Sequence, residues 1–591
     1  MEVYFQLIRD PETLATACRE LETAAFLGFD TETTELDPYA GDLRLIQLSN
    51  GNVTKVIDLR PFKMRGDLKT MPELAPLRAI LASVSQVKIA HNAKFDAKWI
   101  RHHLGTEING IYDTYLASQL IAAGDTDRRH SLADVSQYFL GTELDKSQQI
   151  SDWAADELTQ SQLEYAARDA VVMVGLREKL QERIETDGLD RAARLEFDCV
   201  MPIAEMELNG FYLDESRWRE QLERVKGTLT GVADDLQDML AAGVAQASLF
   251  GRTEINLDSQ GQVADALMNL GVPLPDTTRA WQLQPLVEEF PVVGKLLEYR
   301  GVAKAISSFG ENFLEFIQTQ TGRVHADFRQ IGAPTGRFSC SNPNLQQIPH
   351  EHEYRRCFRA PEGKKLIIAD YSQIELRILA DFSDDEKFIE AFVSGEDFHT
   401  TTASQVFGVH PEKVTPEQRS FAKRLNFGVV YGIGASRFAL MTGLSQTDAE
   451  NTLRKYFATY RGLNEWLRNA GRTVVNERLA RTGSGRMMRF RFDENDRQQI
   501  AGARRNGMNM PIQGTSADIL KRSLRLLHDS ISDTSARLVN IVHDEVIVEC
   551  DSTDAEATAG KLKSAMIAAG QEFVRRVPVV VDIKTADEWS K

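Results

Sequence analysis

One stretch of sixteen residues constrains this chain more than any other: Lys365–Ala380, with the sequence KLIIADYSQIELRILA. Its apolar run ends in Asp370 and Tyr371, and the residues that follow favour a helix. Taken alone, such a run also fits a buried helix, and a strand that ends in a turn aspartate is its commonest meaning. A second acidic pair, Asp544-Glu545, stands far downstream in the apolar segment LVNIVHDEVIVEC. Two acidic clusters at strand ends, brought together by the fold, are what a two-metal phosphoryl-transfer site requires.

Length and composition predict a multidomain protein outside any membrane. A chain of 591 residues is too long for one hydrophobic core and suggests roughly three to five domains. Its hydrophobic content of 42% and charged content of 26% are those of an ordinary soluble protein. No apolar run reaches the ~18 residues of a membrane span, and no signal peptide opens the sequence. The five cysteines form no CxxC pair, so we expect neither disulfides nor a zinc site, and a reducing cell interior.

The distribution of the cations matters more than the net charge. The formal charge of −17 argues against a nucleic-acid partner, but phosphate binding depends on where the cations lie. Each group alone fits a solvated face, whereas three groups in one half of the chain favour a phosphate-binding groove. The groups are Arg355, Arg356 and Arg359; Arg419, Lys423 and Arg424; and Arg481, Arg486, Arg489, Arg491, Arg504 and Arg505.

The first 190 residues bring acidic side chains to strand and helix positions. Asp30 and Glu32 end an apolar strand, where residues i and i+2 share a side and can share a metal ion. Strands are also expected at Leu43–Ser49 and Val53–Leu59. After a strand at Gln86–Ala90, Asn92 and Asp96 are four residues apart, which predicts one face of a helix. A lone DxE pair usually marks a turn.

A second helix supplies the last members of this acidic set. The segment Leu158–Leu176 reads as helical, with Tyr165 and Asp169 again four residues apart. Ser161 and Glu164 have the spacing of a capping box at its start. Each element alone is as well explained by structure as by chemistry, but their order and spacing together favour a metal site. Hard oxygen ligands suit Mg²⁺ or Mn²⁺.

The C-terminal half contains stripes of cations, amides and aromatics. Arg419, Lys423, Phe427 and Tyr431 recur every fourth residue along one predicted helix, between Pro416 near its start and Gly432 near its end. Cations are rarely buried, so this stripe suits a nucleoside triphosphate better than a core face, although an amphipathic helix with a solvated basic end is the alternative. Two further sets offer donors to phosphates and base edges: Arg337, Asn344 and Gln346 in the turn-rich PTGRFSCSNPNLQQIP, and Arg505, Asn509 and Gln513 at helical spacing.

These motifs resemble those of two known families. The acidic set with its tyrosine resembles the proofreading 3′→5′ exonucleases of the DEDD type. The segments DYSQIELR, RSFAKRLNFGVVYG and VHDE match motifs A, B and C of family A DNA polymerases, and TGRFSCSNPNLQQIP and NMPIQGTSAD match further blocks. The chain is most similar to the large (Klenow) fragment of bacterial members. The resemblance covers nearly the whole chain and is looser over 214–320.

The resemblance implies roles for individual residues. Metal ligands would be Asp370, the Tyr371 carbonyl and Asp544 at one site, with Glu545 nearby, and Asp30, Glu32, Asp96 and Asp169 at the other, where Tyr165 would position the attacking water. Arg419, Lys423 and His399 would hold the triphosphate, Glu375 would exclude a 2′-hydroxyl, Phe427 would discriminate against 3′-deoxy analogues, and Tyr431 would flank the templating base. Contacts to DNA would come from Arg337, Asn344, Gln346, Arg505, Asn509, Gln513 and His543.

The resemblance also implies an architecture: an α/β multidomain protein with an RNase H-like DEDD exonuclease domain followed by a right-hand polymerase domain. We expect the exonuclease at residues 1–190 and the polymerase at 191–591. Within it the thumb would span about 214–320, the palm about 191–213, 321–380 and 525–591, and the fingers about 381–524. In the thumb, Trp218 and Trp281 are expected in the core, and INLDSQGQVADALMNLG resembles a helix-capping segment after a loop that meets the DNA backbone.

The expected activity is DNA-templated extension of a primer 3′ end with dNTPs, together with removal of mispaired 3′ ends, using two Mg²⁺ or Mn²⁺ ions per site. Primer-template DNA is the expected partner of a cytoplasmic monomer; accessory replication proteins stay unidentified. One alternative is a chiefly 3′-5′ exonuclease whose C-terminal half is a DNA-binding platform. An RNA polymerase fits less well because of Glu375, and a non-enzymatic DNA-binding scaffold would not need acidic clusters, which repel phosphate.

Overall fold

The computed structural model describes residues 3–145, 147–148, 150–242, 255–274, 277–349 and 352–590. The chain divides into two compact units, which we describe separately. The first comprises Met1–Gly210, Ala326–Gln346 and Glu362–Ala586, and the second comprises Phe211–His325, Gln347–Pro361 and Asp587–Lys591. Among the described residues, no helix combines the length and the apolarity that a membrane span needs.

A six-stranded mixed sheet organises the N-terminal part of the first unit. Its strand order is β1-β4-β3-β2-β5-β6, with β3 antiparallel to both β2 and β4 and the other neighbours parallel. The strand expected at Leu43–Ser49 is confirmed, and the one expected at Val53–Leu59 is shorter by a residue at each end. The strands are β1 (Gln6–Ile8), β2 (Phe26–Thr33), β3 (Leu43–Ser49), β4 (Thr54–Asp58), β5 (Val87–Ala90) and β6 (Ile111–Asp113).

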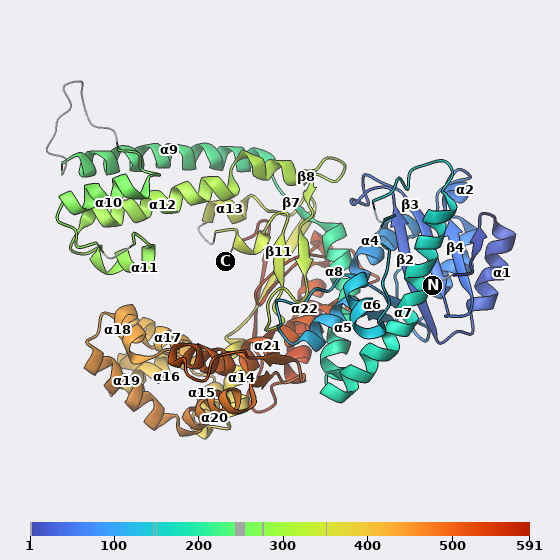
Figure 1. The fold of residues 1–591 in the computed structure, drawn as a ribbon. Helices are drawn as coiled ribbons and strands as arrows, with labels where there is room; N and C mark the ends of the chain where they lie inside the picture. Colours follow the sequence, from blue (N-terminus) through green and yellow to red (C-terminus); the bar gives the residue numbers. More distant parts are fainter. Residues whose placement is uncertain are drawn as a thin grey trace. The chain divides into compact units, whose positions relative to one another are not determined.

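Seven helices accompany this sheet, and Figure 1 shows the longest, α7, lying across β2 and β3. The close approach depends on Gly28 of β2, where a Cβ would come within 1.9 Å of the Ala170 carbonyl oxygen on α7. The helices are α1 (Pro11–Leu21), α2 (Arg60–Lys63), α3 (Ala75–Ala82), α4 (Ala93–Leu104), α5 (Thr114–Ala122), α6 (Leu132–Leu140) and α7 (Gln160–Asp187).

Two local predictions for these helices are wrong. The capping box of α7 is formed by Thr159 and Gln162, two residues before the expected pair, since both pairs fit the motif and the chain turns into the helix at Thr159. Asn92 does not share a helix face with Asp96, because it precedes α4 in the left-handed region with φ 62°.

The helix α8 (Asp190–Asn209) continues from the sheet domain to the C-terminal part of the unit. It packs against α4 on one side and against α21 (Arg497–Ile531) and β15 (Arg537–Val542) on the other. It ends at Asn209, and Gly210 is its C-cap, a position where glycine is a common stop signal.

The second sheet of this unit has four antiparallel strands in the order β15-β16-β12-β17. The strand β12 (Lys364–Tyr371) lies between β16 (Glu545–Asp551) and β17 (Val581–Ala586), and α22 (Ala555–Gln571) packs on the sheet. The central position of β12 explains its apolar sequence, because both its edges and most of its side chains are buried.

Helices form most of the segment between β12 and β15. The stripe helix α17 packs on α16 and α14, and the long α21 packs on α20 and α22. These helices are α14 (Ile374–Ser383), α15 (Glu386–Val393), α16 (Phe398–Phe407), α17 (Pro416–Val430), α18 (Ala435–Thr442), α19 (Gln446–Thr459) and α20 (Arg461–Glu477). Two small hairpins complete the unit: β10 (Asp327–Arg329) with β11 (Ser339–Ser341), and β13 (Leu479–Arg481) with β14 (Met487–Arg489).

The second unit is mainly helical, and Figure 1 shows α9 and α12 running alongside each other. Trp218 is fully buried and stacks on Phe313, as predicted, whereas Trp281 is 68% exposed, so its expected place in the core is wrong. Ser259 caps α10 as the resemblance implied, but the segment before it, 243–254, lies outside the described residues. The elements are α9 (Glu215–Ala241), α10 (Gln260–Asn269), α11 (Ala280–Leu283), α12 (Pro291–Phe309), α13 (His352–Arg356), β7 (Phe211–Tyr212), β8 (Ile317–Gln318) and β9 (Arg323–Val324).

The first predicted group of phosphate-binding cations is engaged within this second unit. Arg355 is buried with its guanidinium 4.2 Å from the centre of the Trp589 ring. Arg356 pairs with Glu588, and Arg359 pairs with Asp214. The prediction that this group faces phosphate is therefore wrong for Arg355, because its guanidinium is buried against the Trp589 ring.

Candidate functional site

The N-terminal acidic residues meet in one cavity. Its volume is about 680 Å³, and its walls include all five of the residues singled out in the sequence: Asp30, Glu32, Asp96, Tyr165 and Asp169. The contact of Gly28 with Ala170 brings β2 against α7, so that Asp169 is carried towards Asp30. Three separate elements thus deliver four carboxylates to one place.

The start of α4 is fixed by a buried carboxylate that the sequence reasoning missed. Asp113, at the end of β6, accepts hydrogen bonds from the backbone of Asn92 at 3.1 Å and of Ala93 at 2.8 Å. It thereby orients the first turn of α4, which carries Asp96. Thr31 then donates to Asp96 at 2.6 Å. An acidic residue at a strand end, in GIYDTY, was the available signal for Asp113.

The four carboxylates are electrostatically frustrated in the absence of cations. Burial, with mutual repulsion, raises the pKa of Asp30 and of Glu32 well above their ordinary values. Burial also raises the pKa of Asp96 to about 7 and that of Asp169 to about 6, although the Tyr165 hydroxyl hydrogen-bonded to Asp169 opposes the latter shift. A cluster of oxygen ligands whose charges repel one another fits divalent cations.

The cavity also has walls that the sequence reasoning did not anticipate. His91 and Tyr115 lie on one side, and Arg329 and Gln330, from far along the chain at the end of β10, lie on another. An exposed guanidinium at the rim of an acidic cavity is suited to a phosphate group. No spacing rule could connect residue 329 to residue 30, because the contact depends on the tertiary fold.

The second acidic cluster forms at the junction of β12 with the β15–β16 hairpin. In the antiparallel register, Asp370 stands directly opposite Glu545. Asp544 lies in the tight turn next to His543, which adopts φ 58°, and the Asp544 carbonyl accepts a hydrogen bond from the Tyr371 backbone at 3.4 Å. The apolar segments that end in Asp370 and that contain Asp544-Glu545 therefore meet at neighbouring strand ends.

Glu375, in the first turn of α14, is held by two of the predicted site residues. Its carboxylate forms an ion pair with Arg337 and accepts a hydrogen bond from the Tyr431 hydroxyl at 3.1 Å. Burial raises the pKa of Glu375, although Arg337 and Tyr431 oppose the shift. Glu375 at the start of α14 thus joins two other segments: the turn that carries Arg337 and the C-terminal end of α17.

The stripe on α17 lies on an open face of the helix. Arg419 and Lys423 are exposed, whereas the core side is formed by residues such as Leu425 and Val429. Arg419 makes a bidentate ion pair with Asp397, with N–O distances of 2.8 and 2.9 Å. Asp397 also caps α16, and its dual role was not predicted. The exposure of Arg419 and Lys423 contradicts a core face, and it fits both a triphosphate site and the alternative of an amphipathic helix with a solvated basic end.

His399 is placed beside this stripe in a defined protonation state. It is buried on α16, and its Nδ1 accepts a hydrogen bond from the Asn426 side chain at 3.1 Å. Burial lowers the pKa of His399 to about 4, and the neighbouring Arg419 and Lys423 add to the shift while Asp397 opposes it. A neutral ring that accepts at Nδ1 carries its proton at Nε2, from which it can donate to a phosphate oxygen.

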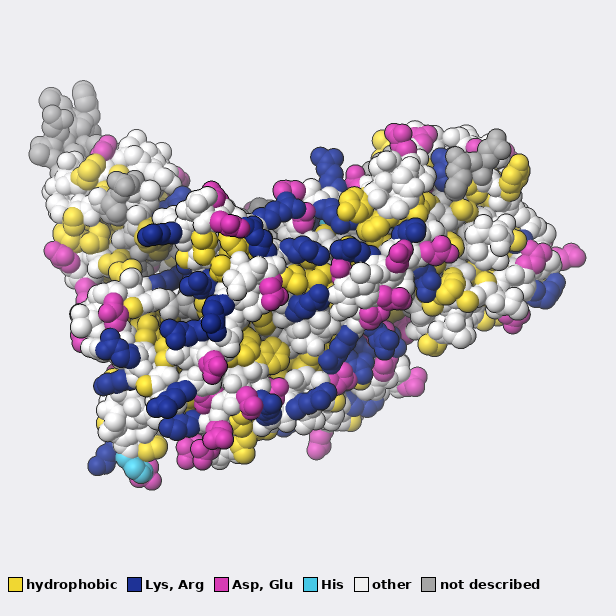
Figure 2. Space-filling view, turned by 60° about the horizontal axis from the view of Figure 1, so that its bottom comes forward, with side chains coloured by type: hydrophobic (Ala, Val, Ile, Leu, Met, Phe, Trp, Pro, Cys, Tyr) yellow, Lys and Arg dark blue, Asp and Glu magenta, His cyan; other side chains and the backbone are white. Residues whose placement is uncertain are grey.

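The residues expected to contact DNA lie on several elements of the first unit. The helix α21 carries Arg505, Asn509 and Gln513. His543 is in the β15–β16 turn, and Asn344 and Gln346 lie just after β11. Their contacts with DNA stay predictions. Figure 2 shows Lys and Arg side chains gathered in groups on one face of the molecule, so the negative net charge coexists with local positive surface.

Comparison with known proteins identifies a different family model for each of two parts of the chain. A family model described as DNA polymerase family A matches residues 226–591, and one described as 3′-5′ exonuclease matches residues 5–185. DNA polymerase I of Aquifex aeolicus is 30% identical over 99% of this chain and 100% of its own length. DNA polymerase I of Pseudomonas aeruginosa is 29% identical over 100% of this chain but only 66% of its own length.

A solved structure extends the likeness to three dimensions. The POL domain of Pol1 from M. smegmatis, in complex with DNA primer-template and dNTP, matches with a TM-score of 0.84 and 27% identity over 99% of both chains. The prediction of an exonuclease domain followed by a polymerase domain is confirmed. The chain belongs to DNA polymerase family A and contains a 3′-5′ exonuclease domain ahead of its polymerase region.

Proposed function

We propose that this enzyme extends a primer 3′ end with dNTPs on a DNA template at Asp370 and Asp544, and removes mispaired 3′ ends at the cavity of Asp30, Glu32, Asp96 and Asp169. The observation that supports it most is the register that sets Asp370 opposite Glu545, with Asp544 in the adjoining turn. Hydrolysis of a 3′ end and its extension are opposed reactions, and this chain has a separate acidic cluster for each.

Both clusters fit divalent metal ions by their chemistry. In the exonuclease cavity, the buried carboxylates with raised pKa values lose their repulsion when cations neutralise them. At the other cluster, Asp370, the Tyr371 carbonyl and Asp544 supply hard oxygen ligands at adjoining strand ends. We propose two Mg²⁺ or Mn²⁺ ions per site, held by Asp370, the Tyr371 carbonyl and Asp544 at one and by the four carboxylates of the cavity at the other. When bound, such ions stabilise negative charge on the attacking and leaving oxygens. The family membership supports divalent metals in general.

The chain's own groups supply positioning around these clusters. In the exonuclease cavity, the Tyr165 hydroxyl beside Asp169 is placed to orient a water molecule, and Arg329 to bind a phosphate. At the polymerase cluster, Arg419, Lys423 and the Nε2 proton of His399 face a triphosphate along α17 and α16. Phe427 and Tyr431 complete that side for sugar and base. Catalysis of this kind is mainly positioning and electrostatics.

Arg419 should matter through its charge. We expect Arg419→Ala to raise KM for dNTPs by about tenfold or more, because a lost charge-assisted hydrogen bond is worth about 1.5–3 kcal/mol. Steady-state extension of a primed template measures it. Asp397→Asn is the matched variant: it breaks the same ion pair but leaves the guanidinium, so KM should rise by less than twofold. Equal effects of the two variants would show that Arg419 is structural.

Glu375 should govern the choice of sugar. We expect Glu375→Ala to lower the preference for dNTP over rNTP by at least about tenfold, since the carboxylate held by Arg337 and Tyr431 excludes a 2′-hydroxyl by its volume. The ratio of kcat/KM for the two substrates on one template measures it. An unchanged ratio would remove Glu375 from this role, and with it the argument against RNA synthesis.

One assay separates the proposal from the alternative of a chiefly exonucleolytic enzyme. Incubation of the wild-type protein with a primed template, Mg²⁺ and labelled dNTPs should give products longer than the primer. Shortening of the primer without incorporation would favour the exonuclease on a DNA-binding platform. A monomer in the cytoplasm, without membrane contact, is part of the proposal; the same assay with added replication proteins would reveal a processivity partner.

A further inference from the structure

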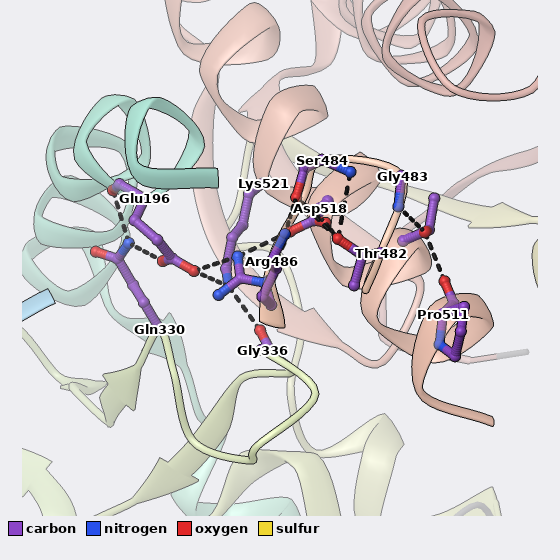
Figure 3. A network of polar contacts seen from close by, with 11 residues as sticks. Glu196, Gln330, Gly336, Thr482, Gly483, Ser484, Arg486, Pro511, Asp518 and Lys521 are labelled. Atoms are coloured by element: carbon purple, nitrogen blue, oxygen red, sulfur yellow. Dashed lines mark hydrogen bonds and ion pairs between the residues drawn. The ribbon is translucent and has the colours of Figure 1, made fainter. Parts of the chain in front are cut away.

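A buried network of charged and polar side chains joins four parts of the first unit (Figure 3). Its two anions are Glu196 on α8 and Asp518 on α21, and its two cations are Arg486, in the β13–β14 turn, and Lys521 on α21. All four are at least 98% buried. The proposed function assigns them no role. The prediction that Arg486 belongs to the third group of phosphate-binding cations is wrong, because its side chain is buried in this network.

The charges of the network are matched one to one. Glu196 accepts from Arg486 and from Lys521, both at 2.6 Å, and Asp518 accepts from Arg486 at 2.8 and 3.1 Å. Both cations lower the pKa of Glu196 against the effect of its burial. Taking four charges out of water is costly, so a buried network of this kind is weak evidence for stability alone. We therefore infer that the network serves to position the segments that it joins.

Lys521 makes one further hydrogen bond, to a backbone group outside the four charged residues. Its ammonium donates to the backbone carbonyl of Gly336 at 2.6 Å and lies 5.2 Å from the centre of the Phe338 ring. These contacts bracket Arg337, the residue that pairs with Glu375. Figure 3 shows Lys521 between Glu196 and Gly336.

The backbone at Gly336 has little room to move. Its φ is +86°, and a Cβ there would lie 2.6 Å from Nε of Arg486. The turn is closed by the Arg337 carbonyl, which accepts from the backbone of Gly332 at 2.9 Å and of Ala333 at 3.1 Å. Arg486 therefore packs against the peptide that precedes Arg337, and Lys521 holds that peptide by a hydrogen bond to its carbonyl.

We propose that Lys521 is a positioning residue of the polymerase site: by fixing the Gly336 carbonyl it places Arg337 to hold Glu375, and so sets the discrimination against ribonucleotides. Glu196 compensates the buried charge of Lys521. This inference rests on the proposed role of Glu375. A displacement of Arg337 by about 1 Å would be enough to weaken this discrimination, because a misplacement of that size can lower a reaction rate by about a hundredfold even when its cause lies far from the reacting atoms.

The test uses a double variant that keeps the buried charges balanced, with one of its single variants as the control for the lost anion. The double variant E196Q/K521M removes the donor to Gly336 without leaving a lone anion, and E196Q alone removes the same anion but keeps the donor. We expect the dNTP-to-rNTP ratio of kcat/KM to fall about tenfold in the double variant and to stay within twofold of wild type in E196Q. The circular dichroism spectrum should match that of wild type for both variants, and it reports an intact fold.

Two further variants decide how the effect is transmitted. G336A displaces the same peptide against Arg486 without touching a charge, and it should lower the ratio as the double variant does, even if the latter does not fold. R337M should lower the ratio too, and adding it to E196Q/K521M should cause no further fall, because coupled residues are not additive.

The outcomes separate the inference from the proposed function. If E375A lowers the ratio but E196Q/K521M and G336A leave it unchanged, Lys521 is structural only and the inference is overturned while the proposed function stands. Effects of R337M and the double variant that add would also overturn it. If E375A itself leaves the ratio unchanged, the failure lies with the proposed role of Glu375.

Discussion

Replacing Asp370 with asparagine is expected to abolish primer extension while leaving digestion of 3′ ends intact. The change preserves the size of the side chain, and the β12 register opposite Glu545 is made by backbone bonds that an amide does not alter. What is lost is one negative ligand at the strand end, and loss of a single preorganised electrostatic group costs at least about a hundredfold in rate. On a matched primer-template with dNTPs and Mg²⁺, the variant should therefore only shorten the primer.

The control for this variant lies on the same strand pair. Asp551, at the far end of the β12–β16 ladder, is exposed and pairs with Lys364 at 3.1 Å. D551N changes the same chemical group on the same sheet, about as far along it as the strands allow, and should extend primers within twofold of wild type. Extension by D370N at a rate near that of wild type would contradict the assignment of the polymerase site.

Local sequence was sufficient to predict the strand ends that carry the acids. The apolar run before Asp370 and the one before His543 each became a buried strand, and the turn between β15 and β16 is the hairpin that their spacing indicates. What sequence could not supply was the insertion of β12 between β16 and β17, since pairing of distant strands leaves no periodic signal. The resemblance to known motifs implied only that Asp370 and Asp544 share one metal site.

The features that were missed depend on contacts between distant segments. Asp397 as the partner of Arg419, Arg329 in the wall of the exonuclease cavity, and the pairing of Lys521 with Glu196 all join residues that local spacing does not relate. The predicted capping box of α7 was wrong for another reason. Two overlapping pairs of residues fit the capping-box motif equally well, and the path of the chain before the helix decides between them. Trp281 shows that an aromatic in an amphipathic segment need not be buried.

The second large effect is expected at the exonuclease cavity. The double variant D30N/E32Q should lower digestion of single-stranded 3′ ends by at least about a hundredfold, because two of four carboxylates that fit metal ions lose their charge. Extension of a matched primer should be unchanged, and mispaired ends should persist in the product. E178Q, an exposed carboxylate on α7, is the matched control. Normal digestion by D30N/E32Q would show that the cavity is not the nuclease site.

In the absence of metal ions, the same variant should also be more stable than wild type. This gain would not be expected if the four carboxylates only stabilised the fold. The pKa values of Asp30 and Glu32 are raised in the folded protein, so protonation favours folding: this contribution is fully present below the unfolded pKa near 4 and is lost as the pH rises through the folded values. In EDTA at pH 8, D30N/E32Q should therefore unfold at a higher temperature than wild type. At pH 4 the gain should vanish. Mg²⁺ at pH 8 should stabilise wild type more than the variant; equal stabilisation of the two by Mg²⁺ would place the metal ions elsewhere.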